Sequence, residues 1–137
     1  MITAQSEKKE CILVVDDSED NLYLMQFILE SQGYKVSLAD NGQDALSKIE
    51  RCHPDLILLD VMMPRMNGYE VVNQLRIDEN LSSIPVYFIT ADKYFRWCKA
   101  IAAGADGIIY KPINIEELLQ IVKQSLKSVD DSATNRR

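Results

Sequence analysis

The sequence lacks the features that mark secreted or membrane-embedded proteins. Its three cysteines, Cys11, Cys52 and Cys98, form no CxxC pair and indicate neither a disulfide framework nor a zinc site. We therefore expect a cytoplasmic, reducing location. No apolar run approaches the ~20 residues that cross a bilayer, and the first ten residues contain no apolar signal segment. Membrane insertion is accordingly not expected.

Positive charge is also in short supply. The chain has 15 Lys+Arg against 21 Asp+Glu, a net charge of −6. Because binding to the phosphate backbone of DNA or RNA requires a basic surface, we expect no direct contact with nucleic acid. A chain of 137 residues is long enough to bury one core without disulfides or structural metals. We predict one domain over 11–127, between flexible polar segments at 1–10 and 128–137.

Short apolar runs alternate with stretches of helical periodicity. The five runs, which we interpret as strands, are 11–15, 36–39, 56–59, 86–89 and 108–110. The stretches between and after them place apolar residues at helical spacing, although the fourth, about 93–103, is the least regular. Alternation repeated five times predicts an α/β fold, a five-stranded parallel sheet with helices on both faces.

Polar residues follow the ends of the predicted strands. Asp16 and Asp17 follow the first strand, Asp60 the third, Thr90 the fourth and Lys111 the fifth. In an open parallel sheet, ligands bind beyond the carboxyl ends of the strands, where the strand order reverses. We therefore expect three carboxylates, one hydroxyl and one ammonium to meet in one pocket.

Such a pocket requires a cation. At roughly 5 Å and an effective dielectric constant near 20, two carboxylates repel by about 3 kcal/mol. Oxygen ligands suit a hard divalent cation, so the pattern predicts Mg²⁺, with Mn²⁺ as an alternative ion. With an ammonium and a hydroxyl nearby, one carboxylate could then attack a phosphoryl group and form an aspartyl phosphate.

Five segments extend this pattern to most of the chain. They are Val-Val-Asp-Asp-Ser at 14–18, Leu-Asp-Val-Met-Met-Pro-Arg-Met-Asn-Gly at 59–68, Ile-Thr-Ala at 89–91, Gly-Ala-Asp-Gly at 104–107 and Tyr-Lys-Pro at 110–112. In order and spacing, they closely resemble the receiver domain of two-component response regulators, of the stand-alone, single-domain type. The resemblance covers 11–127 and implies the flavodoxin-like receiver fold, a doubly wound five-stranded parallel sheet of order 2-1-3-4-5 with five helices.

The resemblance implies a role for each residue of the pocket. Asp60 would be the phosphoacceptor and, with Asp17, a direct ligand of Mg²⁺. Asp16 would bind the ion through water, and Met62 through its backbone carbonyl alone. Thr90 and Lys111 would contact the phosphoryl oxygens.

In the family, the peptide bond between this lysine and the following proline is cis, so the resemblance implies a cis bond between Lys111 and Pro112. The implied phosphodonor is a sensor histidine kinase or a histidine phosphotransfer protein. Phosphorylation would change the affinity for an output protein that the sequence does not name. No turnover of an external substrate is implied, so we do not expect an enzyme in the ordinary sense.

The sequence departs from the family at the position of its aromatic switch. Three residues before the lysine, where Tyr or Phe is usual, stands Ile108. An aliphatic side chain cannot swing a ring between buried and exposed positions. Tyr110 lies two residues on, hence on the same strand face, and we hypothesise that it takes over part of that role.

Aromatic residues gather at two other places. Tyr94, Phe95 and Trp97 crowd the start of the fourth predicted helix, and helical spacing cannot bury all three. A partner surface or a homodimer seam, on one hand, and internal packing, on the other, are equally compatible with them. Tyr23 and Phe27 form an i,i+4 pair on the first helix, near the rim where receivers meet their histidine phosphodonors.

Two other functions compete with a phosphorylation switch. A degenerate receiver would act as a phosphorylation-independent interaction module, but every position of the acidic pocket is filled. A Mg²⁺-dependent phosphatase would need a second acid two residues beyond the nucleophile, where Met62 stands. Because only a few polar residues follow 127, we expect the signal to leave through a protein–protein surface.

Overall fold

Strands and helices alternate strictly along the computed structural model, which describes the backbone of residues 9–135 and the side chains of residues 9–127. The strands are β1 (Cys11–Val15), β2 (Lys35–Ala39), β3 (Leu56–Asp60), β4 (Val86–Thr90) and β5 (Gly107–Tyr110). The helices are α2 (Glu19–Glu30), α3 (Gly42–Cys52), α4 (Gly68–Ile77), α5 (Trp97–Ala103) and α6 (Ile115–Asn135). Each predicted strand therefore exists, within a residue of its predicted bounds.

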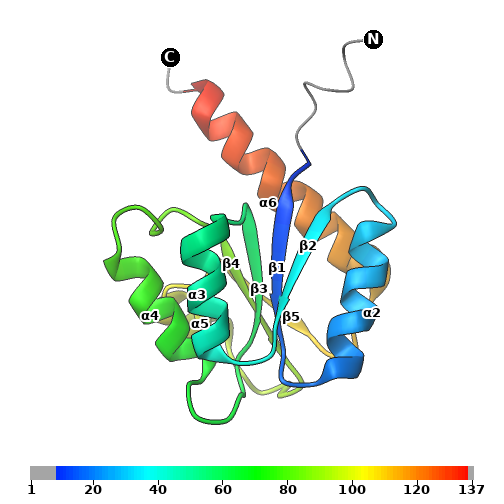
Figure 1. Cartoon of the computed structure of the whole chain (residues 1–137), viewed down its shortest axis with the longest axis vertical. Helices are drawn as coiled ribbons and strands as arrows, with labels where there is room; N and C mark the ends of the chain where they lie inside the picture. The colour runs from blue at the N-terminus through cyan, green and yellow to red at the C-terminus, as the bar shows by residue number, and fades with distance from the viewer. Residues whose placement is uncertain (1–8, 136–137) are drawn as a thin grey trace.

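The strands form one parallel sheet in the order β2-β1-β3-β4-β5, as predicted. In the interior strand β1, Leu13 pairs with Ser37 of β2 on one side and with Ile57 of β3 on the other. All four neighbouring pairs are parallel, so the carboxyl ends of the strands lie together, at the bottom of Figure 1. The chain crosses back through a helix after each strand (Figure 1).

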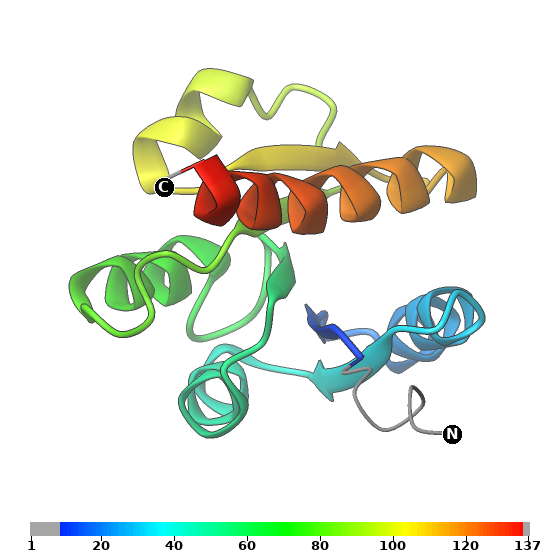
Figure 2. The same cartoon turned by 90° about the horizontal axis from the view of Figure 1, so that it is seen from above.

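Side chains alternate between two apolar cores, one on each face of the sheet. Leu13, Ile57 and Phe88 pack with α3, α4 and α5, whereas Ile12 and Leu58 pack with α2 and α6. Figure 2 shows this separation of the helices by the sheet. Every residue of β3 is buried, which explains its continuously apolar sequence. The cores hold the carboxyl ends of β1 and β3 side by side.

Local capping places two helices against those strand ends. The Ser18 side chain accepts a hydrogen bond from the Asn21 amide, so α2 begins directly after the two aspartates that follow β1. Asn67 and Glu70 form a capping box at the start of α4. At Gly68, a Cβ atom would lie 3.0 Å from the backbone oxygen of Asp60, so glycine allows α4 to start against the end of β3.

Two boundaries differ from the sequence prediction. The fourth helix begins at Trp97, later than the predicted 93, because the Asp92 carboxylate and carbonyl accept the amides of Tyr94 and Phe95 in a preceding turn. The last helix continues to Asn135, into the segment 128–137 for which no regular structure was expected; the flexibility of that segment stays a prediction. The predicted flexible segment at 1–10 lies, except for its last two residues, outside the described residues. Among the described helices, none is both long and apolar enough to cross a membrane.

Candidate functional site

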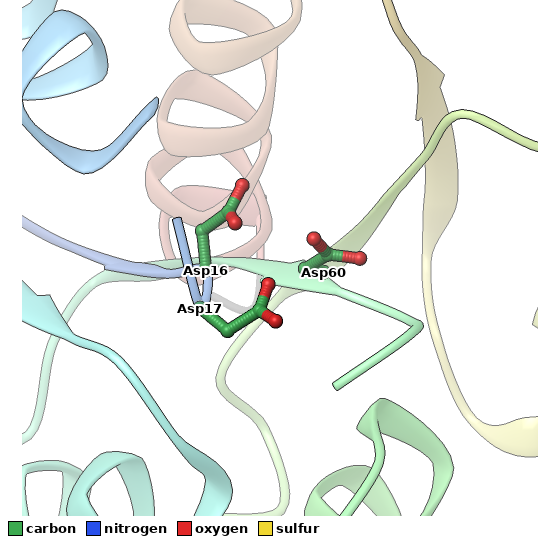
Figure 3. Close-up of side chains that lie close together, drawn as sticks. All are labelled: Asp16, Asp17 and Asp60. Carbon is green, nitrogen blue, oxygen red and sulfur yellow. The ribbon is translucent and has the colours of Figure 1, made fainter. Parts of the chain in front are cut away.

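The three predicted carboxylates meet at the carboxyl ends of β1 and β3. One carboxylate oxygen from each of Asp16, Asp17 and Asp60 lies within 4.8 Å of the other two. Figure 3 shows the three side chains gathered where these two strands end. Asp16 and Asp60 are buried, whereas Asp17 is exposed. The cluster therefore opens to solvent on the side of Asp17.

Lys111 bridges the two buried carboxylates. Its Nζ atom lies 3.1 Å from Oδ2 of Asp16 and 3.2 Å from Oδ2 of Asp60. The other oxygen of Asp60 accepts the backbone N–H of Met62 at 3.0 Å. Lys111 directly follows β5 and precedes the cis peptide bond to Pro112, as expected from the resemblance. One ammonium thus faces three carboxylates, which leaves excess negative charge in the pocket.

Asp16 has additional partners that the sequence did not reveal as a set. The amide of Ser18 donates to its Oδ1 at 2.9 Å, and the Asn21 side chain donates to its Oδ2 at 3.3 Å. These bonds hold Asp16 in place from the first turn of α2. The sequence signal for Asn21 is its position one turn into a helix that follows the two aspartates.

The pKa values of the buried pair reflect opposing influences. Burial raises the pKa of Asp60, and the Asp16 charge adds to this, while Lys111 and the Met62 N–H act in the opposite direction without cancelling it. Burial by itself would lower the pKa of Lys111, but its bonds to Asp16 and Asp60 outweigh that and raise it. Lys111 therefore holds its proton more tightly than a free lysine does, and the neighbouring Asp60 carboxyl group loses its proton less readily than a free aspartic acid does.

Thr90 completes the predicted constellation. It is the last residue of β4, is buried, and follows Ile89, the residue of β4 that pairs with Asp60. Its hydroxyl accepts the backbone N–H of Asp92 at 3.0 Å. The sheet register thus brings Thr90 to the same edge as the carboxylates. The hydrogen bond to Asp92 connects it to the loop that leads into α5.

The donor set of this pocket fits a divalent metal ion. Three carboxylates supply hard oxygen atoms from two strand ends, and they converge without a second cation among the described residues to balance them. Asp17 is exposed, so one ligand of the cluster is reachable from solvent. The backbone carbonyl of Met62 remains a predicted fourth ligand.

The aromatic residues named as partner-surface candidates divide into exposed and buried groups. Tyr94 is 81% and Trp97 is 60% exposed, whereas Phe95 is 8% exposed. The inclusion of Phe95 in a partner surface is therefore wrong, since its ring packs edge-on against Tyr69 and Phe88 with centroids 6.0 and 5.9 Å away. The expectation that not all three aromatics are buried is correct.

The remaining candidates lie on α2 and β5. Tyr23 and Phe27 are both exposed on α2, on the helix that starts beside the carboxylates. Ile108 is half-buried and packs against the core on the α5 face. Tyr110 is partly exposed, and its hydroxyl donates to the backbone oxygen of Phe95 at 2.5 Å. Tyr110 therefore joins β5 to the segment before α5.

Comparison with known proteins agrees with this geometry. The family model described as the response regulator receiver domain matches residues 12–123. The chain belongs to this family, the receiver domains of two-component signalling.

Its relatives include both long and short proteins. The chain is 41% identical over 123 residues to the alkaline phosphatase synthesis transcriptional regulatory protein PhoP of Bacillus subtilis, covering 89% of this chain and 50% of PhoP. It is 36% identical over 120 residues to protein PilH of Pseudomonas aeruginosa, covering 84% of this chain and 96% of PilH. The chain thus spans about half the length of PhoP and nearly all of PilH.

Among solved structures, the chain is similar to the receiver domain of a sensor histidine kinase from Pseudomonas aeruginosa. The TM-score is 0.81 and the identity 29%, with 88% of this chain and 99% of that one covered. That receiver was crystallised with a magnesium ion coordinated in its active-site cleft. The likeness concerns the fold over most of both chains.

Proposed function

We propose that this protein is a phosphorylation switch in which Asp60 accepts a phosphoryl group from a phosphohistidine in a Mg²⁺-dependent reaction. The observation that carries the proposal is the convergence of three carboxylates within 4.8 Å, with Lys111 joined to two of them. A structural ion pair needs one carboxylate for one ammonium. The excess of negative charge favours a site that awaits a cation and a phosphoryl group.

Asp16, Asp17 and Asp60 are the residues that would hold the Mg²⁺ ion, with the Met62 carbonyl as a further ligand. The magnesium ion of the similar kinase receiver supports this assignment. When bound, the ion would offset the repulsion among the carboxylates and stabilise negative charge on the phosphoryl oxygens. The exposed position of Asp17 gives the ion a path of entry.

Asp60 is the nucleophile of the proposed step. One of its carboxylate oxygens forms a bond to phosphorus while the bond from phosphorus to the donor's imidazole nitrogen breaks, and the imidazole leaves with the electron pair. The Met62 N–H and Lys111 orient the carboxylate before the donor arrives. Lys111 and the Thr90 hydroxyl then contact phosphoryl oxygens. Because Asp60 itself carries the product, we expect no turnover of an external substrate.

The phosphodonor in this proposal is a sensor histidine kinase or a histidine phosphotransfer protein. Tyr23 and Phe27 support a contact with it, because both are exposed on the helix that begins beside Asp17. Aromatic side chains supply a large contact area on protein interfaces. Direct nucleic-acid contact is not part of the proposal, and the cytoplasmic location stays a prediction.

Intact-mass measurement tests the proposal. The protein is incubated with Mg²⁺ and acetyl phosphate, and we expect the mass of one added phosphoryl group on the wild type and none on Asp60→Asn. Asp55→Asn is the matched control, because Asp55 stands at the opposite end of the same strand and accepts the Cys11 amide there. This control variant should be phosphorylated like the wild type.

Other outcomes would point to the competing functions. The absence of an adduct, with acetyl phosphate and with phosphohistidine donors alike, would favour a degenerate receiver that serves only as an interaction module. Continuous release of phosphate from simple phosphate esters would favour a phosphatase. An adduct that persists in Asp60→Asn would place the phosphoacceptor elsewhere.

A further inference from the structure

Asn21 contacts the acidic pocket, although it is not one of the residues that the sequence predicted for it. It lies in the first turn of α2 and is half-buried, and its side-chain amide donates to Oδ2 of Asp16 at 3.3 Å. The start of α2 does not need this amide group, because the Ser18 side chain already accepts the backbone N–H of Asn21. The Asn21 side chain is therefore available for a role in the pocket itself.

The oxygen of Asp16 that Asn21 contacts also binds Lys111. The Lys111 Nζ atom lies 3.1 Å from this Oδ2 atom and 3.2 Å from Oδ2 of Asp60. The other oxygen of Asp16 accepts the Ser18 N–H at 2.9 Å. Asp16 is buried, so it depends on these donors. One neutral donor and one cation thus share a single oxygen of a buried carboxylate.

The proposed phosphorylation would draw the cation away from this shared oxygen. A phosphoryl group adds negative charge and strong acceptor oxygens to Asp60, which Lys111 already contacts. Lys111 would then turn to the phosphoryl oxygens and leave Asp16. Because a buried acceptor that loses its donor is destabilised, Asp16 would oppose this movement unless another donor stayed on its Oδ2 atom.

We propose that Asn21 is a positioning residue, which keeps a donor on Asp16 and thereby lets Lys111 turn from Asp16 to the phosphoryl group on Asp60. This inference rests on the proposed function of Asp60. The amide suits the role because it donates a hydrogen bond without adding charge to the pocket. Asn21→Ala would leave Oδ2 of Asp16 with Lys111 alone and hold Lys111 back. Asn21→Asp, of nearly the same shape, would add a fourth carboxylate that attracts Lys111.

The rate of phosphoryl uptake gives the first test. Time courses of intact mass are recorded for the full chain with acetyl phosphate and saturating Mg²⁺. We expect Asn21→Ala to be slower than the wild type by about tenfold, less than the loss on removing a donor that contacts the reacting oxygens. Asn21→Asp should be slower still, since its carboxylate also repels the anionic phosphodonor. Asn21→Gln keeps the amide and should recover part of the rate.

Binding of Mg²⁺ alone, measured by calorimetry, separates this role from that of a residue that only orients a metal ligand. Replacing a residue of the latter kind weakens metal binding by about tenfold or more. In Asn21→Ala, Asp16 keeps the Ser18 N–H and Lys111, so we expect the affinity for Mg²⁺ to change little. Asn21→Asp should bind the ion at least as tightly as the wild type, because it adds negative charge. Uptake should therefore fall while metal binding is retained.

Asn73 provides the matched control. It is exposed in the middle of α4, so Asn73→Ala and Asn73→Asp make the same chemical changes on another helix. Both should take up the phosphoryl group at the wild-type rate. Urea unfolding verifies the fold of each variant. If Asn21→Ala does not fold, the nearly isosteric Asn21→Asp decides: slow uptake with Mg²⁺ binding retained supports the role, and a wild-type rate overturns it.

Three results would overturn the role of Asn21. One is uptake by Asn21→Ala at the wild-type rate. Another is an equal loss of uptake and of Mg²⁺ affinity in that variant, which would make Asn21 an orienting residue for a metal ligand. The third is uptake by Asn21→Gln as slow as by Asn21→Ala, which would mean that the amide donor is not what matters.

Failure of the proposed function would look different. All three results above require that the wild type forms an adduct. A wild type that takes up no phosphoryl group from acetyl phosphate or from phosphohistidine donors overturns the proposed function, and the role of Asn21 falls with it.

Discussion

Two polar clusters lie at opposite ends of the same sheet, and they differ in how well their charges are balanced. At the carboxyl end, Lys111 faces the carboxylates of Asp16, Asp17 and Asp60. At the amino end, the guanidinium group of Arg76 is surrounded by oxygen atoms that accept hydrogen bonds from its N–H groups. We call this second set the Arg76 cluster; it consists of Arg76, Ser82, Ile84, Gly104 and Asp106.

The Arg76 cluster is electrically and geometrically complete. The guanidinium donates to three backbone carbonyls, those of Gly104, Ser82 and Ile84, at 2.8–2.9 Å. It also pairs with Asp106 at 3.2 Å, and the same carboxylate accepts the amide of Val86. One positive charge thus meets one negative charge, as in a structural link between α4 and the starts of β4 and β5.

The difference separates structural from functional use of charged side chains. In the Arg76 cluster each group has its partner, so the cluster can stabilise the fold without a ligand. The acidic pocket instead keeps surplus carboxylate, which costs free energy until a cation arrives. Four predictions test this contrast, beginning with the largest effect.

Replacing the cation of each cluster should affect different properties. Lys111→Met removes the positive charge from the phosphoacceptor, and we expect phosphoryl uptake from acetyl phosphate to slow by about 10²-fold or more. Arg76→Met should leave uptake unchanged, because Arg76 lies at the other end of the sheet. Time courses of intact mass measure both. A similar loss of uptake in both variants would contradict the division.

The stability of the fold should respond in the opposite way. Arg76→Met leaves three carbonyls without their side-chain donor and the Asp106 carboxylate without its ion-pair partner, and we expect the free energy of unfolding in urea to fall by about 2–4 kcal/mol. Arg76→Lys, which keeps the charge but not the fork of donors, should recover only part of this. Full recovery by lysine would show that charge alone holds the cluster.

Magnesium should stabilise the acidic pocket. At tenfold excess over its dissociation constant, the ion should add about 1.4 kcal/mol to the free energy of unfolding of the wild type. Asp17→Ala removes one proposed ligand and should lose most of this effect, whereas Asp55→Ala should keep it. Melting curves with and without Mg²⁺ measure the difference. Equal shifts in all three proteins would mean that the ion binds elsewhere.

Neutralising the phosphoacceptor should stabilise the protein when no divalent ion is present. Since burial raises the pKa of Asp60, the native state holds this proton at pH values where the unfolded chain has lost it. Stability therefore falls as pH rises above the ordinary carboxyl pKa and through the raised value. Asp60→Asn removes that loss, so we expect it to be more stable than the wild type near neutral pH. Urea titrations across pH in a chelating buffer test this; a less stable Asp60→Asn would contradict it.

Much of the fold and of the site follows from local pattern. The apolar runs separated by helical stretches predicted the five strands and the parallel sheet, because the two hydrophobic periods alternate along the chain. The strand order followed from the resemblance to receiver domains. Asp16, Asp17, Asp60, Thr90 and Lys111 were predicted to converge because each follows a strand, and parallel strands end at one edge. The structure brings these residues to that edge.

Contacts between distant segments were not predictable in this way. Nothing in the local sequence separates Phe95 from Tyr94, yet one is buried and the other exposed. The turn held by Asp92 directs Phe95 inward, where Tyr69 and Phe88 receive its ring. The same holds for the Arg76 cluster, whose members belong to three segments of the chain.

The amino-acid sequence alone thus determined the class of fold, the edge that carries the chemistry and the excess of acid over base at that edge. These depend on periodicity and on which residue follows each strand, both of which are local. Only the tertiary structure decided that Lys111 joins Asp16 to Asp60, and that the Tyr110 hydroxyl donates to the Phe95 carbonyl. Such contacts depend on side-chain packing across the sheet, which no local pattern encodes.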